Sequence, residues 1–276
     1  MMKKLKCLLG TLILVAGLAV FSQVQIVHAE QIEKDGFVFD PYEDEHAESK
    51  GTVCLVGYIG SEKNLVIPES VQGKTVYAVV PQVFSGNTKI ESVKLSNTVK
   101  VIGMYAFSDC TKLKEVHLGS LQYAYEWHGL DGMLSGCGNL EKLTMSDEAD
   151  FDLTANSSDH KFDIFNRNVR DNLKYIYIGS HMTRVSKELF YGTNLETVEV
   201  GKGNSLYSSY GGVVYSADGK ELIVCGTSYP NTVYEIPEGV TTLGSIGFSE
   251  CQNIKTLVIP ETVKKSAVKI CGGWTS

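Results

Sequence analysis

The amino-acid sequence repeats one pattern between residues 65 and 118, and this repetition constrains the fold more than any other feature. The stretch LVIPESVQGKTVYAVVPQVFSGNTKIESVKL is followed by SNTVKVIGMYAFSDCTKLKEVHL. Phe84 and Phe107 stand 23 residues apart in it, as do Val93 and Val116. A fixed period of this length is typical of a solenoid, because one short coil cannot bury its own apolar face and therefore stacks on the next.

The strand-like part of each coil reads L-x-x-V-x-L, follows an apolar or aromatic anchor, and returns along the chain with irregular spacing. Strand side chains alternate between two faces, so the spaced apolar residues are predicted to point into a core. The further copies are Leu140/Leu143/Met145, Leu173/Ile176/Ile178, Leu195/Val198/Val200 and Ile254/Leu257/Ile259. The anchors are Phe84, Phe107, Leu134, Phe165, Phe190 and Phe248.

The copies are most irregular over residues 120–172, and residues 204–230 interrupt them again. The second interruption contains YSSYGGVVYSADGKELIVC, which is two β-type runs around the turn residues Ala217-Asp218-Gly219. This turn chemistry predicts an inserted β-hairpin. The segment TVYEIP at residues 232–237 then restarts the strand motif.

The combined pattern V-x-I-P … V … I-G … A-F-x-x-C … L-x-x-V-x-L resembles the BspA-type (treponemal-type) leucine-rich repeat of bacterial surface proteins. The resemblance covers roughly residues 36–263 and includes the hairpin sequence GVVYSADGKEL. The best-matching positions are Val99, Ile102-Gly103, Ala106-Phe107 and Cys110, followed by Val240, Leu243-Gly244, Phe248 and Cys251. The chain departs from the pattern at Leu134 in place of Phe, Gly192 in place of Cys and Gly247 in place of Ala.

The resemblance implies a leucine-rich repeat solenoid, a right-handed superhelix of about seven to eight turns. Short parallel β-strands would stack on one face and short helical or 3₁₀ turns on the other, with β-hairpin elaborations. We expect a monomer. The resemblance also implies adhesion to host matrix proteins, other cells or surface glycans, an expectation that rests on analogy of fold.

The first 29 residues have the pattern of a secretory signal peptide. Lys3, Lys4 and Lys6 precede an apolar stretch, and Val27-His28-Ala29 resembles a small-residue cleavage site. No second long apolar stretch follows, so we expect no stable membrane insertion after cleavage. The expected location is therefore secreted or at the bacterial cell surface.

The mature chain is predicted to be one solenoid with a different segment at each end. Residues 30–64 are expected to form a capping hairpin, and residues 65–263 the repeat solenoid. Residues 264–276 begin a turn that never resolves, which indicates either a truncated reading frame or a disordered last turn. Solenoids need a polar cap at each end, and only the N-terminal end has a candidate.

Charge and motif content argue against several classes of function. Removal of the signal would leave 22 basic and 32 acidic residues, a net charge of −10, whereas nucleic-acid binding needs clustered Lys and Arg. No metal-binding histidine pair and no hydrolase, zinc-protease or phosphate-loop motif is present. The acidic run at residues 147–152 could hold calcium with Asp159 and Asp163, but its spacing favours a solvated insertion loop. We therefore expect no cofactor, no metal and no catalysis.

Six cysteines would remain after removal of the signal, at positions 54, 110, 137, 225, 251 and 271. Cys110, Cys137 and Cys251 share the position three residues after the anchor, where a small buried side chain is expected. Neighbouring coils lie close enough for a Cys110–Cys137 disulfide, but parallel in-register side chains favour buried thiols instead.

The positions on either side of the central residue of L-x-x-V-x-L are predicted to point away from the core. Tyr175 and Tyr177 stand out among them, because exposed rings can anchor a sugar or a protein partner. The alternative is that the rings only pair with neighbours and so favour the strand. One column reads Ser92, Glu115, Lys142, Tyr175 and Thr197; the other reads Lys94, His117, Thr144, Tyr177 and Glu199.

A second aromatic group, Tyr123, Tyr125 and Trp127, alternates along an irregular coil. Burial preference favours a core role for these rings, and exposure would make them an extension of the same surface.

Taken together, these features predict an exported, non-catalytic recognition module. Its partner would be an extracellular protein or glycan that binds the outward face of the repeat sheet. The alternatives are a non-catalytic repeat arm or fragment of a larger surface enzyme, and a structural spacer.

Overall fold

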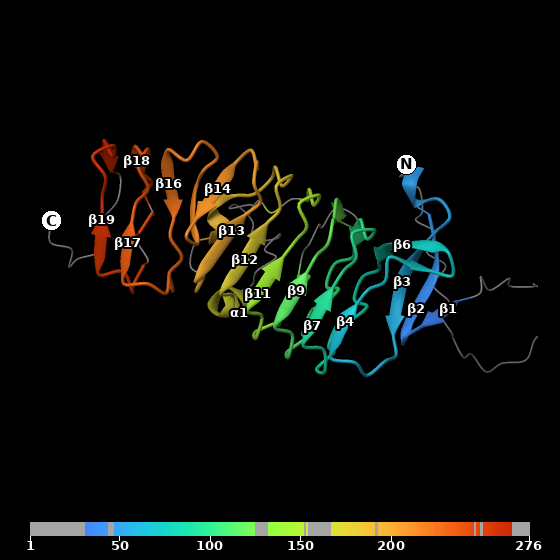
Figure 1. Cartoon of the computed structure of the whole chain (residues 1–276). Helices are drawn as coiled ribbons and strands as arrows, with labels where there is room; N and C mark the ends of the chain where they lie inside the picture. Colours follow the sequence, from blue (N-terminus) through green and yellow to red (C-terminus); the bar gives the residue numbers. More distant parts are fainter. Residues whose placement is uncertain are drawn as a thin grey trace, which may run out of the picture.

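A computed structural model describes residues 31–43, 47–124, 132–151, 153, 167–190, 193–245, 247–248 and 251–266. The chain winds into an elongated solenoid of about eight turns, in which successive coils follow one another from the N-terminal to the C-terminal end (Figure 1). The predicted signal peptide and most of the predicted last turn lie outside the described residues.

One face of the solenoid is a six-stranded parallel sheet to which each coil contributes one strand. The central apolar residues of neighbouring strands are Cα partners and are buried, for example Val93, Val116 and Leu143. The predicted L-x-x-V-x-L ladder is therefore confirmed in these coils. The strands are β4 (Asn64–Val66), β7 (Ser92–Lys94), β9 (Glu115–His117), β11 (Lys142–Thr144), β12 (Tyr175–Ile178) and β13 (Thr197–Val200).

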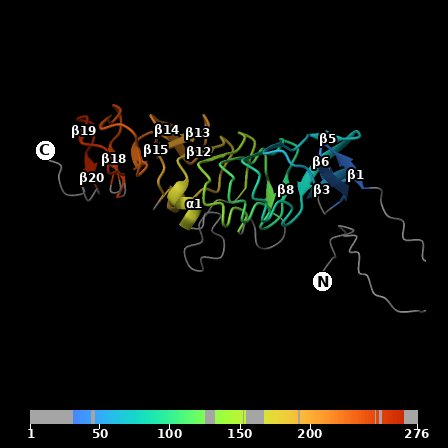
Figure 2. The same cartoon turned by 90° about the horizontal axis from the view of Figure 1, so that it is seen from below.

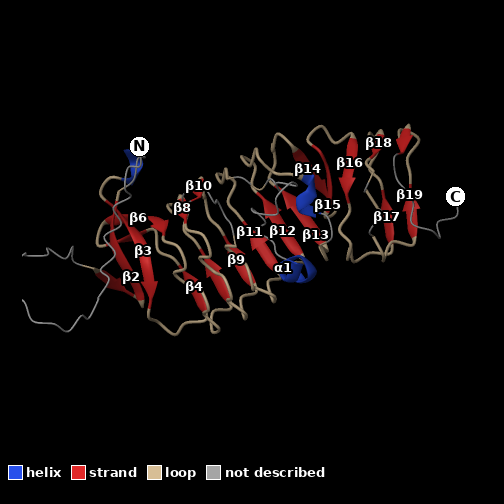
Figure 3. Cartoon of the chain, turned by 180° about the vertical axis from the view of Figure 1, so that it is seen from behind, coloured by secondary structure: helices blue, strands red, loops and turns tan. Residues whose placement is uncertain are grey.

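A second face begins with three antiparallel strands and continues with parallel ones, and Figure 3 shows it from behind. The antiparallel strands are β1 (Ile32–Lys34), β2 (Phe37–Tyr42) and β3 (Thr52–Tyr58), with a 3₁₀ turn, η1 (Ala47–Ser49), between the last two. The parallel strands are β6 (Lys74–Val79), β8 (Val101–Ile102) and β10 (Tyr123–Ala124), and β5 (Ser70–Val71) pairs with β6. Phe37, Phe39 and Leu55 join the main core, so these N-terminal strands cover its end.

The remaining side of each coil is a turn that is hydrogen-bonded to the turn of the next coil. The N–H of Phe84 donates to the carbonyl of Ala106 at 2.9 Å, and that of Phe107 donates to Met133 at 3.0 Å. Helix is scarce in the described residues: it comprises α1 (Arg167–Asn172), which Figure 2 shows below the sheet, and short 3₁₀ turns such as η3 (Lys187–Phe190). Strands and turns thus occupy the sides where the resemblance implied helical turns.

The core is a continuous ladder of apolar side chains that crosses from coil to coil. The rings of Phe84 and Phe107 are stacked, with centroids 5.3 Å apart and planes 9° apart. The predicted anchors Leu134, Phe190 and Phe248 are buried as well, whereas Phe165 lies outside the described residues. Stacked rings of this kind add to the burial energy of each coil contact.

The predicted hairpin contains three antiparallel strands rather than two. They are β14 (Tyr207–Tyr210), β15 (Val213–Ser216) and β16 (Glu221–Val224). The extra turn is at Gly211-Gly212, whose φ angles of 57° and 82° suit the two-residue turns that glycine permits. The predicted turn at Ala217-Asp218-Gly219 is confirmed, since the Asp218 carboxylate accepts the N–H of Lys220 at 3.1 Å.

After the hairpin the coil pattern resumes on both faces. Strands β17 (Val233–Glu235) and β19 (Thr256–Val258) form a parallel pair, and β18 (Thr242–Leu243) and β20 (Lys265–Ser266) extend the sheet of β14, β15 and β16. The core position predicted for Ile259 is wrong, because its side chain is 50% exposed. Among the described residues, β20 is the sole strand that follows Ile259, and no further strand covers this side chain. None of the helices in the described part of the chain is long and apolar enough to cross a membrane.

We predict that Leu113→Ala lowers the free energy of unfolding by about 2–5 kcal/mol, because it leaves a cavity in a fully buried site between coils. Glu115→Ala is the matched control two residues later in the same coil, where the side chain is exposed, and it should change stability by less than about 0.5 kcal/mol. Urea unfolding followed by circular dichroism measures both. Equal losses in the two variants would contradict the inward and outward assignment.

Candidate binding face

The residues that flank each central strand residue form the outward face of the six-stranded sheet, in two columns of Cα partners. The predicted register of all ten residues is confirmed, and β4 adds Asn64 and Val66 to them, while a role in binding stays a prediction. The first column is Asn64, Ser92, Glu115, Lys142, Tyr175 and Thr197. The second column is Val66, Lys94, His117, Thr144, Tyr177 and Glu199.

Tyr175 and Tyr177 lie side by side on β12, and each hydroxyl donates to a carboxylate from another coil. The Tyr175 hydroxyl is 2.6 Å from Oε2 of Glu199, and the Tyr177 hydroxyl is 2.7 Å from Oδ1 of Asp147. Hydrogen bonds to a charged acceptor at these lengths are strong. Lys142 adds a cation–π contact, with Nζ 5.4 Å from the centroid of the Tyr175 ring. Both rings are half-buried and held in fixed orientations.

The same contacts shift the acid–base behaviour of the tyrosines and of Asp147. Burial, and then the hydrogen bond to Asp147, raise the pKa of Tyr177 to about 12. Burial and the Glu199 carboxylate likewise raise the pKa of Tyr175. The hydrogen bond from Tyr177, followed by that from the Ser180 N–H, lowers the pKa of Asp147 below 3.8. At neutral pH the two hydroxyls therefore remain donors, and Asp147 remains an anion.

Asp147 is held in place by the backbone of the following coil. Its Oδ1 also accepts the N–H of Ser180 at 3.0 Å, and its own carbonyl oxygen lies 2.6 Å from Nδ1 of His181. A Cβ at Gly201 would lie 2.4 Å from the same Oδ1, so a larger residue there would displace the carboxylate. The Gly201-Lys202-Gly203 turn therefore leaves the space in which the carboxylate of Asp147 lies.

The acidic run that contains Asp147 is part of a regular coil and not an insertion, whereas Asp147 and Glu148 are exposed to solvent as their charge predicted. Ala149 is fully buried, and its N–H donates to Ser146 just as the N–H of Val99 donates to Ser96. Serine and a small apolar residue three positions later mark the same turn in both coils. The carboxylate of Glu148 accepts the Ser120 hydroxyl at 3.0 Å. Asp152, Asp159 and Asp163 lie outside the described residues.

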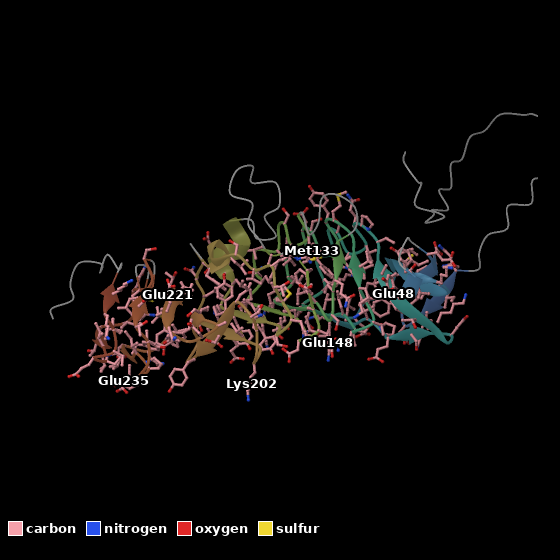
Figure 4. The ribbon with its side chains drawn as sticks, turned by 90° about the horizontal axis from the view of Figure 1, so that it is seen from above. Glu48, Met133, Glu148, Lys202, Glu221 and Glu235 are labelled. Carbon is pink, nitrogen blue, oxygen red and sulfur yellow. The ribbon has the colours of Figure 1, made fainter. Side chains whose placement is uncertain are left out.

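The other outward residues pair mainly with one another. Nδ1 of His117 lies 2.9 Å from the Thr144 hydroxyl, and burial lowers the pKa of His117, which keeps its ring neutral at neutral pH. The Ser92 hydroxyl donates to the Asn64 side chain at 2.8 Å. In Figure 4, the side chains of Glu148, Lys202 and Glu235 lie along one margin of the solenoid. Within the described part of the chain, no three His, Cys, Asp or Glu side chains gather closely enough to hold a metal ion.

The structure adds an exposed aromatic residue that the repeat pattern did not single out. Tyr210 is 65% exposed at the end of β14, beside the turn that contacts the free edge of β13. There the Val198 N–H donates to the carbonyl of Gly212 at 3.0 Å, and Gly212 packs on Thr197. The Gly-Gly pair after Tyr210 is a turn signal in the sequence, but it lies outside the repeat pattern, so its position relative to the sheet could not be predicted.

Of the second aromatic group, only the backbone of Tyr123 is described, at the start of β10, where it pairs with Val101. Tyr125 and Trp127 lie outside the described residues. The two interpretations of this group, core or extended surface, therefore stay predictions.

The stacked parallel strands, the turn ladder and the anchored phenylalanines define a leucine-rich repeat solenoid. The chain matches the BspA type leucine rich repeat region in six copies, over residues 77–210 and 228–270. It belongs to this family, as the sequence resemblance implied. The family description rests on the repeat and does not specify a ligand.

Similar solved structures come from several bacteria. A leucine rich cell surface protein from Faecalibacterium prausnitzii shares 20% identity, covering 86% of this chain and 72% of that one, with a TM-score of 0.36. The pneumococcal vaccine antigen PcpA shares 18%, with coverages of 86% and 71% and a TM-score of 0.41. A T. pallidum leucine rich repeat protein shares 17%, covering 86% of both chains, with a TM-score of 0.36. No curated protein matches the chain.

We predict that Tyr177→Phe raises the pKa of Asp147 toward 3.8, because it removes the hydrogen bond that most favours the carboxylate. The pKa of Asp147 is lower in the folded state than in the unfolded state. The hydrogen bond therefore stabilises the fold fully at pH values above the unfolded pKa, and this stabilisation is lost as the pH falls through the folded pKa. NMR titration of the carboxyl carbons measures the shift. Tyr175→Phe, which removes the bond to Glu199 instead, should leave the pKa of Asp147 in place, and an equal shift in both variants would refute the assignment.

Proposed function

We propose that this protein is an exported recognition module that binds an extracellular protein or glycan through the outward face of its six-stranded sheet, without catalysis. The observation that carries the proposal is the pair of half-exposed tyrosine rings on β12. Side chains on this face are not needed to fill the core, so packing does not dictate their identity. Aromatic rings that lose little freedom on binding make effective anchors for a partner.

The contacts of Tyr175 and Tyr177 favour recognition over a role in strand pairing alone. Strand pairing would be served by any large side chain, whereas here carboxylates from β13 and from the Asp147 turn hold both hydroxyls. A ring that is already oriented has less conformational entropy to lose when a partner binds. Tyr210 supplies a further exposed ring at the hairpin tip, two residues before Gly212, which approaches Thr197.

Export and a surface location are part of the proposal. The first 29 residues have the lysine-rich start, apolar stretch and small-residue site of a signal peptide. Membership of the BspA type family, whose repeat is that of bacterial surface proteins, supports an extracellular setting. A spacer would need no aligned aromatic face, and an enzyme would need convergent titratable groups in a pocket.

We predict that the double variant Tyr175→Ala/Tyr177→Ala loses binding at least about tenfold, because two anchor rings contribute most of the energy of a small interface. The wild type is screened first on arrays of glycans and extracellular-matrix proteins, and each hit is then titrated by biolayer interferometry. Ser92→Ala/Lys94→Ala is the matched control, since it changes the same two columns on β7, and it should bind within about twofold of wild type. Thermal unfolding followed by circular dichroism verifies that both variants fold.

Equal binding by wild type and the tyrosine variant would remove the site from β12, and loss of binding in a Tyr210→Ala variant would then assign it to the hairpin tip. Absence of any hit on either array would favour the spacer or the arm of a larger surface protein over the recognition module.

A further inference from the structure

Cys225 and Cys251 are buried in neighbouring coils near the C-terminal end of the described solenoid. Cys225 directly follows β16, and Cys251 follows β18 in the next coil. Their side chains are 2% and 8% exposed, and both belong to the second, smaller core cluster. Neither residue lies on the proposed binding face, so the chemistry of this pair is independent of the proposed function.

The two cysteines are in direct contact. Sγ of Cys251 lies 3.4 Å from the carbonyl oxygen of Cys225 and 3.3 Å from that of Gly226. The Cys251 side chain, and then burial, raise the pKa of Cys225. Sγ of Cys251 therefore lies beside Cys225, and stacked neighbouring coils have a spacing that suits a disulfide.

The repeat explains why two cysteines meet here and not in the regular coils. In those coils a cysteine thiol donates to the carbonyl of a phenylalanine anchor in the preceding coil: Cys110 to Phe84 at 3.1 Å, and Cys137 to Phe107 at 3.0 Å. In the pair Cys110–Cys137, for which the sequence left a disulfide open, each thiol therefore lies beside the anchor of the preceding coil, and that anchor is a phenylalanine rather than a cysteine. Each thiol is buried, as the spacing predicted.

Cys225 occupies the anchor position of its own coil. It stands nine residues before Tyr234, the central residue of β17, just as Phe107 stands nine before Val116. Tyr229 is buried in the same core cluster, with its ring edge-on to that of Tyr234 and the ring centroids 5.5 Å apart. The thiol of Cys251 consequently donates to the carbonyl of a cysteine where its counterparts donate to the carbonyl of a phenylalanine.

We propose that Cys225 and Cys251 form a disulfide when the chain folds in an oxidising compartment. The oxidant is a second disulfide, carried by a thiol–disulfide oxidoreductase or by oxidised glutathione. One cysteine thiolate attacks that disulfide and displaces one thiolate, and the other cysteine thiolate then attacks the mixed disulfide and displaces the second. Two protons leave the cysteines, and their two electrons reduce the oxidant to two thiols.

Two features of the C-terminal coils make a cross-link useful there. The second core cluster is far smaller than the first, and core-type side chains at its end are uncovered, with Leu257 half-buried and Ile259 50% exposed. Small cores commonly depend on covalent links. A bond between Cys225 and Cys251 would join the hairpin coil to the next one across a loop that the unfolded chain would otherwise leave free.

The timing of the reaction depends on burial. Both thiols are buried in the folded, reduced protein, so oxidant added after folding should react slowly with them. The bond is therefore expected to form during folding, while both cysteines are accessible.

The test is to unfold and reduce the purified protein, refold it in a buffer of reduced and oxidised glutathione, block free thiols with iodoacetamide, and map the peptides by mass spectrometry without reduction. We expect a Cys225–Cys251 peptide and blocked Cys110 and Cys137. The oxidised protein should melt roughly 5–10 °C higher than the same sample treated with reductant. Protease should cleave residues 225–266 more slowly in the oxidised sample.

The variant Cys225→Ser should abolish the linked peptide and the melting difference, whereas Cys110→Ser should keep both. Blocked, unlinked Cys225 and Cys251 in refolded wild type would overturn the proposal, and so would a disulfide between other cysteines. The wild-type peptide map decides the matter even if Cys225→Ser fails to fold.

Discussion

The stacking of one coil on the next is the interaction on which the whole structure depends. A single coil exposes one apolar surface on each side, and only the next coil covers it, as Phe107 covers Phe84 with parallel rings 5.3 Å apart. Backbone hydrogen bonds also join each coil to the next, on the strand side between β7 and β9 and on the turn side between Phe84 and Ala106. Stability therefore accumulates along the chain, and each end needs a different solution. At the N-terminal end, Phe39 and Leu55 of the antiparallel strands provide it.

This stacking also builds the outward face. A register that aligns Val116 with Leu143 in the core must align Glu115 with Lys142 and His117 with Thr144 outside, because alternate side chains of a strand lie on opposite faces. The face is thus an ordered array whose spacing is that of the strands, and its composition is free to vary. Where the array contains Tyr175 and Tyr177, carboxylates from neighbouring coils orient the rings, so the rigidity of the core extends to the surface.

The positions that could be predicted from the sequence were mainly those that the repeat spacing determines. Phe84, Phe107, Leu134 and the outward columns could be placed directly from spacing, since a fixed repeat leaves one register for each coil. Asp147 could not, because its charge indicated a solvated loop, whereas it follows Ser146 in a regular turn just as Asn97 follows Ser96. Tyr210 was missed since it belongs to no repeat, and its place depends on how the Gly211-Gly212 turn contacts β13. A contact between two side chains of different coils does not recur with the repeat, so the repeat pattern cannot predict it.

The hairpin insertion separates the main core cluster from the smaller cluster that follows it. Along β15 the side chains alternate, so Val214 packs with the first cluster, while Val213 and Tyr215 pack with the second. The hairpin therefore separates the two clusters and contributes side chains to both. Its turn contacts the edge of β13, which would otherwise remain open for pairing with another strand. After the hairpin, the second cluster forms a shorter stack of apolar side chains. In this shorter stack Cys225 stands at the anchor position in place of phenylalanine, in contact with the thiol of Cys251. A disulfide between the two residues would replace the missing ring contact with a covalent bond.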